Sequence, residues 1–96
     1  MAAYCYFDIL EMKDERKMEI YKEHVLATVD QYGGRYLVIG GPCNLVEGTS
    51  KSKYPVVIEF PGMDQAYHWY NSEEHKALKA LRKEAVEANA VFIQGL

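Results

Sequence analysis

The chain has 96 residues, enough for a single domain over residues 1–96, and a formal net charge of −3. Its lysines are spread among acidic residues and form no basic stripe, which argues against a general nucleic-acid binder. No apolar run reaches membrane-spanning length and no basic region precedes an apolar stretch at the N-terminus. We therefore expect a soluble cytoplasmic protein that acts neither on membranes nor on nucleic acids.

Two cysteines, Cys5 and Cys43, lie far apart in the sequence. Cys5 falls in an apolar run, which predicts a buried position, whereas Cys43 falls in a loop-like segment and is the more exposed of the two. A single pair at this spacing favours neither a disulfide nor a metal site. No Gly-rich loop leads from a strand into a helix through Lys-Ser or Lys-Thr, so the sequence predicts no nucleotide and no other cofactor.

The N-terminal third predicts a strand followed by a helix. Residues 4–10 combine aromatic and β-branched side chains with one acid, a composition typical of a strand buried on both faces. Apolar residues then recur every three or four positions. This spacing predicts an amphipathic helix with Asp14 as its N-cap and Gly33 as its C-terminal stop.

The middle of the chain predicts two further strands separated by a long loop. Residues 35–39 form the second predicted strand, and residues 40–53 are rich in Gly, Ser, Asn and Lys, which indicates a loop. Residues 54–60 form the third. Pro55 has no N–H to donate, so it must lie at the start of this strand or on an unpaired edge.

The C-terminal third predicts two helices and a last strand. A short helix covers residues 63–70. Ser72 can cap a longer helix, whose apolar stripe runs to about Ala88. Residues 90–94 then predict the fourth strand.

The predicted order is strand, helix, strand, strand, helix, strand. A four-stranded antiparallel sheet with both helices on one face satisfies the rules for short, right-handed connections, which is the ferredoxin-like α+β arrangement. The other face of the sheet would then be uncovered, although its strands carry apolar residues. A second copy of the chain is the simplest cover, so we expect a homodimer.

Six short motifs resemble one known family in both order and spacing. They are Tyr-Gly-Gly-Arg-Tyr at 32–36, Gly-Gly at 40–41, Glu-Gly at 47–48, Glu-Phe-Pro at 59–61, Trp-Tyr-Asn-Ser at 69–72 and Ala-Leu-Lys-Ala-Leu-Arg at 77–82. The chain resembles the family called domain of unknown function 1330 over residues 4 to 95. This resemblance implies a dimeric α+β barrel and no established activity. His75 stands where members often carry tyrosine, and Val46 stands where leucine usually precedes the Glu-Gly pair.

Arg35 is the leading candidate for binding an anion, because it stands between two glycine pairs whose backbone can adapt. The alternative is a structural ion pair with Glu47 or Glu59 that fixes the hairpin. Glu59 lies within an apolar strand, so it is either paired with Arg35 or a general acid or base with a raised pKa.

Further candidates lie on the two C-terminal helices. His75 and Arg82 fall on one helical stripe and either form a pair lining a cleft or leave His75 near the surface, where it would titrate normally. Trp69 and Tyr70 flank a helix break, and they either fill the core or stack on a ligand.

Two functions follow from these candidates. The first is a cofactor-independent protein that binds or transforms a small carboxylated molecule, with Arg35 holding the anion and Glu59 or His75 moving a proton. The second is a non-catalytic dimeric scaffold or ligand-binding module in which the same polar residues are structural.

Overall fold

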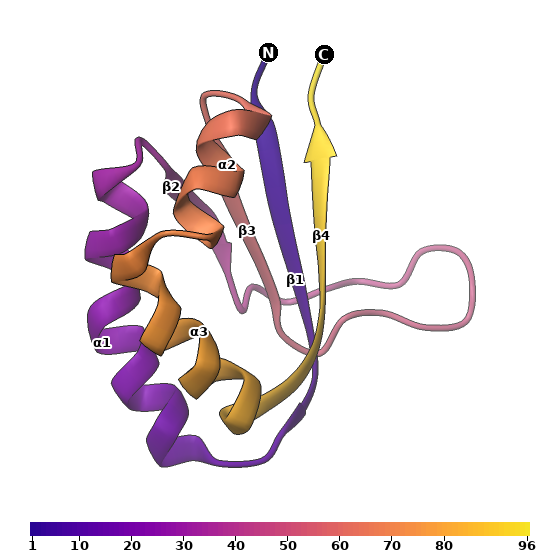
Figure 1. Ribbon diagram of the computed structural model, residues 1–96. Coiled ribbons are helices and arrows are strands. Elements are labelled where there is room, and N and C mark those ends of the chain that lie inside the picture. The colour runs from indigo at the N-terminus through magenta and orange to yellow at the C-terminus, as the bar shows by residue number, and fades with distance from the viewer.

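The computed structural model describes all 96 residues and contains seven elements (Figure 1). They are β1 (Ala3–Met12), α1 (Glu15–Gln31), β2 (Arg35–Ile39), β3 (Pro55–Phe60), α2 (Met63–Tyr70), α3 (Glu73–Ala85) and β4 (Val86–Gln94). The strands form one antiparallel sheet in the order β2-β3-β1-β4, and all helices cover the same face. This arrangement confirms the predicted ferredoxin-like α+β fold.

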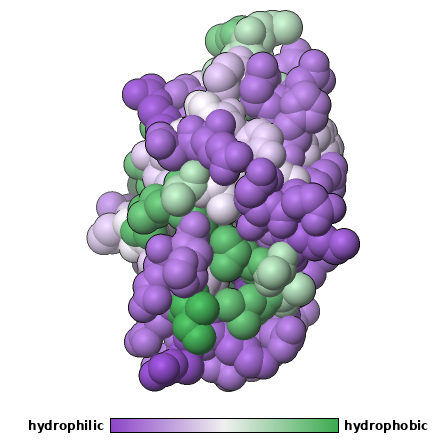
Figure 2. All heavy atoms as spheres, turned by 60° about the vertical axis from the view of Figure 1, so that its left-hand side comes forward, coloured by the Kyte–Doolittle hydropathy of each residue, from purple (hydrophilic) through white to green (hydrophobic).

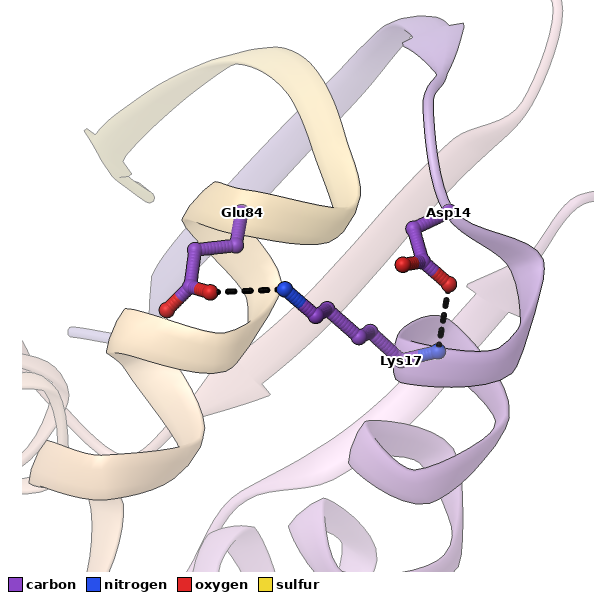
Figure 3. Close-up of polar contacts among 3 residues, drawn as sticks. All are labelled: Asp14, Lys17 and Glu84. Carbon is purple, nitrogen blue, oxygen red and sulfur yellow. Dashed lines mark hydrogen bonds and ion pairs between the residues drawn. The ribbon is translucent and has the colours of Figure 1, made fainter.

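Helix α1 begins and ends where the sequence predicts. The Asp14 carboxylate accepts a hydrogen bond from the backbone N–H of Lys17 at 3.1 Å, which satisfies one of the free donors of the first turn. Gly33, just past the helix, has φ +79°, a conformation that suits glycine and ends the helix. The ammonium group of Lys17 lies 2.8 Å from the Glu84 carboxylate and ties α1 to α3 (Figure 3).

Helices α2 and α3 are separated by the break predicted at Asn71 and Ser72. Ser72 caps α3, because its hydroxyl oxygen accepts a hydrogen bond from the N–H of His75 at 3.2 Å. The same hydroxyl donates to the carbonyl of Trp69 at 2.8 Å, which closes the end of α2. One serine side chain therefore hydrogen-bonds to the end of α2 and to the start of α3.

The predicted end of α3 at about Ala88 is wrong, because the helix ends at Ala85 and β4 begins at Val86. The carbonyl of Ala85 accepts hydrogen bonds from the N–H groups of Lys13 and Asp14, at 2.8 and 3.0 Å. Pairing with the end of β1 therefore overrides the run of helix-forming residues and starts the strand earlier.

The core lies between the helices and the covered face of the sheet, with Trp69 at its centre. Trp69 is fully buried, its ring lies 5.5 Å from that of Phe60 and 6.2 Å from that of Phe7, and its Nε1 donates to the hydroxyl of Thr28 at 3.0 Å. Cys5 is buried in the same core, as predicted, and Cys43 is less enclosed.

The opposite side of the sheet carries no helix, and we call it the open face. Along β1, buried residues alternate with partly exposed ones, so the chain alone buries only one face of this strand, not both as predicted. Apolar side chains of the open face are Tyr4, Tyr6, Val38, Val57, Val91 and Ile93. The loop between β2 and β3 extends from the sheet on the side away from the helices (Figure 1).

Pro55 begins β3, one of the two positions that the sequence allows. None of the helices is both long and apolar enough to cross a membrane.

Candidate functional site

A cavity of about 230 Å³ lies between α1 and the covered face of the sheet, and we call it the Arg82 cavity. Apart from Lys22 and Arg82 its lining is hydrophobic, with side chains from β1, α1, β2 and β3 such as Phe7, Tyr21, Val25, Tyr36, Val56 and Ile58. The surface around α1 is mostly hydrophilic, with hydrophobic atoms gathered in the lower half of the view in Figure 2. An apolar cavity with few polar groups is the usual form of a small-molecule site.

Arg82 supplies the buried charge of this cavity. The residue is 6% exposed, and its guanidinium carbon lies 5.2 Å from the centre of the Phe7 ring. Its Nε atom is enclosed without a hydrogen-bond partner, and none of the three ion pairs of the chain includes Arg82. The two nearby acids are engaged elsewhere, Glu84 by Lys17 and Glu87 by Lys13. The guanidinium therefore has no counter-charge within the chain.

Two phenols share the cavity wall with Arg82. Burial raises the pKa of Tyr21 to about 12, although the positive charge of Arg82 works in the opposite direction. Burial also raises the pKa of Tyr36 well above its ordinary value. Both hydroxyls therefore stay protonated at neutral pH and are able to donate hydrogen bonds.

A second cation, Lys22, lies at the rim of the cavity. Its side chain is exposed, and its ammonium nitrogen lies 4.9 Å from the centre of the Tyr54 ring. Together with Arg82 it gives an apolar cavity two positive charges and no negative one, so the field in this site favours an anion.

His75 lies outside the Arg82 cavity, where it is fully buried and stacked on Trp69 with ring centres 4.2 Å apart. Its Nδ1 lies 3.2 Å from the carbonyl oxygen of Tyr70, which makes Nδ1–H the donor and leaves the enclosed Nε2 without a partner. Burial lowers the pKa of His75 to about 4, the Tyr70 carbonyl opposes this, and the charges of Arg82 and Lys79 add to it. The imidazole is thus neutral at pH 7, and the alternative of a surface histidine that titrates normally is wrong.

The family described as Domain of unknown function (DUF1330) matches residues 2–96. The chain belongs to the DUF1330 family. This confirms the resemblance seen in the sequence motifs. No curated protein sequence matches this DUF1330 chain.

Solved structures resemble the DUF1330 chain at low sequence identity, so this likeness concerns the fold alone. RPA0582 from Rhodopseudomonas palustris, a protein of unknown function, has a TM-score of 0.78 at 11% identity, covering 99% of this chain and 82% of that one. A dimeric ferredoxin-like protein of unknown function from Jannaschia sp. CCS1 has a TM-score of 0.65 at 16% identity, with coverage of 99% and 100%. SnoaB from Streptomyces nogalater, a cofactor-independent oxygenase, has a TM-score of 0.61 at 10% identity, with coverage of 99% and 91%.

In this DUF1330 protein Arg35 lies outside the Arg82 cavity. Its side chain is 72% exposed, and its Nε donates to Glu59 at 2.7 Å, which is the structural ion pair that the sequence offered as the alternative. A pair this exposed stabilises the fold by at most about 1 kcal/mol. Only the Nε atom of Arg35 forms this hydrogen bond, so binding of an anion by its two terminal nitrogen atoms stays a prediction.

The two proton-moving candidates lie on different sides of the sheet. Glu59 pairs across from Tyr4 and belongs with the open face, whereas His75 lies under the helices. Only one of them can therefore meet a molecule bound on a given side. Glu47 is exposed in the long loop, away from both.

Trp69 fills the core, and Tyr70 contacts the ammonium group of Lys79 at 4.1 Å from its ring centre. Neither lines the Arg82 cavity. Sequence reasoning selected Arg82 but missed Tyr21, Tyr36 and Lys22, because helix and strand periodicity predict burial without saying which buried residues border a cavity. No group of three His, Cys, Asp or Glu side chains is placed to hold a metal ion.

Proposed function

We propose that this DUF1330 protein binds a small molecule with an apolar body and a carboxylate in the Arg82 cavity. One observation carries the proposal, namely that a guanidinium group without any counter-charge lines an otherwise apolar cavity. Burying an unpaired charge costs several kcal/mol. The planar fork of an arginine matches a carboxylate in two parallel hydrogen bonds, so a carboxylate ligand offsets this cost.

The cavity walls indicate the rest of the ligand. An apolar cavity of about 150 Å³ holds benzene, so about 230 Å³ suits an apolar body of roughly ten non-hydrogen atoms. The protonated hydroxyls of Tyr21 and Tyr36 are available as further donors to the oxygens of the ligand. Lys22 at the rim attracts anions toward the entrance.

Binding has more support than catalysis by Glu59 or His75. Neither residue lines the Arg82 cavity, and a general acid or base must reach the proton that it moves directly or through one water molecule. The proposed function is therefore that of a ligand-binding module, and proton transfer by these two residues stays a prediction.

The protein acts as a homodimer that pairs through the open face. Six apolar side chains line this face, and covering them removes apolar surface from water. The loop between β2 and β3 extends on the same side of the sheet, and its Leu45 and Val46 are exposed, Val46 at 93%. The Jannaschia relative is described as dimeric, which agrees with this assignment.

Isothermal titration calorimetry tests the ligand site. We expect wild-type protein to bind 3-phenylpropionate and to bind 3-phenyl-1-propanol, which lacks the charge, at least about 30-fold more weakly. We expect the Arg82→Met variant to lose at least about 30-fold in affinity for the carboxylate, because charge-assisted hydrogen bonds contribute about 1.5–3 kcal/mol each.

The matched comparison is Arg35→Met, which removes the same charge from the exposed arginine. Full binding by Arg35→Met together with loss in Arg82→Met supports the Arg82 cavity. Loss in Arg35→Met alone would overturn the proposal in favour of the arginine on β2. Equal binding of acid and alcohol would show that no carboxylate site is present.

Sedimentation equilibrium at micromolar concentration tests the dimer. We expect wild-type protein to sediment at twice its chain mass of 11.0 kDa. The Tyr6→Glu variant should sediment as a monomer, because a carboxylate at the centre of the open face would be desolvated without a partner. Gln65→Glu on the exposed side of α2 is the control and should leave the mass unchanged. A wild-type protein that sediments at 11.0 kDa would contradict the dimer.

A further inference from the structure

A second hollow, of about 280 Å³, lies between α3 and β4, and we call it the side hollow. Its lining includes Tyr70, Arg82, Lys83, Glu87, Ala88 and Ala90. Arg82 and Ala88 also line the Arg82 cavity. The one buried arginine of the chain therefore borders both spaces.

We infer that the site has two compartments, and that its ligand carries a polar substituent on the carbon next to the carboxylate. This inference rests on the proposed function. The carboxylate binds Arg82 at the border, the apolar body fills the Arg82 cavity, and the polar substituent lies in the side hollow.

The position of the guanidinium supports this division. Its carbon lies 5.2 Å from the centre of the Phe7 ring, and Phe7 on β1 pairs across the sheet with Ala90 on β4. Phe7 lines the Arg82 cavity and Ala90 lines the side hollow. A carboxylate held at Arg82 thus has both compartments beside it, and the carbon next to the carboxylate can carry one group toward each.

The two compartments differ in their chemistry. Only two of the 14 residues that line the Arg82 cavity are charged, whereas three of the seven that line the side hollow are charged, namely Arg82, Lys83 and Glu87. The Glu87 carboxylate lies 3.4 Å from the ammonium group of Lys13, while Lys83 forms no ion pair. Lys83 is therefore available to donate to an oxygen of the ligand, such as an amide carbonyl. An N-acylated amino acid with an apolar side chain has this set of groups.

Calorimetry with a matched pair of compounds tests the inference. 3-Phenylpropionate and N-acetylphenylalanine share a benzyl group and a carboxylate, and they differ by the acetamido group on the neighbouring carbon. We expect one enantiomer of N-acetylphenylalanine to bind wild-type protein at least about tenfold more tightly than 3-phenylpropionate. The Ala90→Leu variant, which fills the side hollow, should lose this gain and keep its affinity for 3-phenylpropionate. Ala80→Leu, on the exposed side of α3, is the control and should behave as wild type.

The outcomes separate the two proposals. If 3-phenylpropionate binds and neither enantiomer binds more tightly, the second compartment is wrong and the proposed function stands. If Ala90→Leu keeps the gain, or weakens both compounds equally, the substituent does not lie in the side hollow and the inference is overturned. If none of the compounds binds, both the proposed function and the inference fall.

Discussion

The Arg82→Met variant is expected to be more stable than the wild type when no ligand is present. The guanidinium is 6% exposed and has no counter-charge, so the folded wild type carries an unpaired buried charge that the unfolded chain does not. Methionine fills much of the same space without a charge. We expect the free energy of unfolding, measured by urea denaturation, to rise by about 1–3 kcal/mol.

Bound ligand offsets this difference in stability. At a concentration of 3-phenylpropionate 100 times its Kd for the wild type, the wild type should gain about 2.7 kcal/mol, because the ligand binds only the folded state, and a variant that binds 30-fold more weakly should gain less than about 1 kcal/mol. Arg16→Met, the same substitution at an exposed position of α1, is the control and should change stability by less than about 0.5 kcal/mol. A ligand-free Arg82→Met that unfolds at lower urea than the wild type would show that the contact of Arg82 with Phe7 outweighs the cost of the charge.

The stability of the wild type is expected to fall by about 3 kcal/mol between pH 7 and pH 4 through His75 alone. Burial lowers the pKa of this imidazole in the folded state to about 4, from its ordinary value of 6.5. Within this window the unfolded chain binds a proton at His75 and the folded chain does not, so protons favour unfolding. The contribution of the neutral imidazole is fully present above pH 6.5 and is lost as the pH falls toward 4.

The measurement compares urea denaturation of the wild type and His75→Phe at both pH values. Carboxylates also titrate in this range, but they do so in both proteins, so the difference between the two proteins isolates His75. Phenylalanine keeps an aromatic ring against Trp69 and cannot titrate. His24→Gln changes an exposed histidine and should keep the pH dependence of the wild type. An identical loss of stability in the wild type and His75→Phe would show that His75 is not held neutral.

Much of the fold could be predicted from the sequence because local and global preferences agree. Caps and periodicity place α1 between Asp14 and Gly33, and Pro55 marks the start of β3. The junction of α3 and β4 could not be predicted. Residues near Ala88 continue a helical pattern, and only pairing with β1, distant in sequence, makes the chain extended from Val86.

The site was harder to predict than the fold, because a cavity depends on how elements pack. The flanking glycines made Arg35 the leading candidate for binding an anion, yet its side chain is exposed and pairs with Glu59. Arg82 occupies an apolar helical stripe, which is the one sequence signal of a buried cation. Tyr21 and Tyr36 line the same cavity as Arg82, and only the packing of α1 on the sheet brings them together.

Helix α3 passes directly into strand β4. No residue separates Ala85 from Val86, and two backbone N–H groups hold the Ala85 carbonyl against the end of β1. The junction of the two elements is therefore anchored through the carbonyl group of the last helical residue. Arg82 lies in the last turn of α3, and Val91 and Ile93 of the open face lie on β4. The arginine that lines the cavity and the open face of the sheet are thus joined by one continuous run of regular secondary structure, with no loop between them.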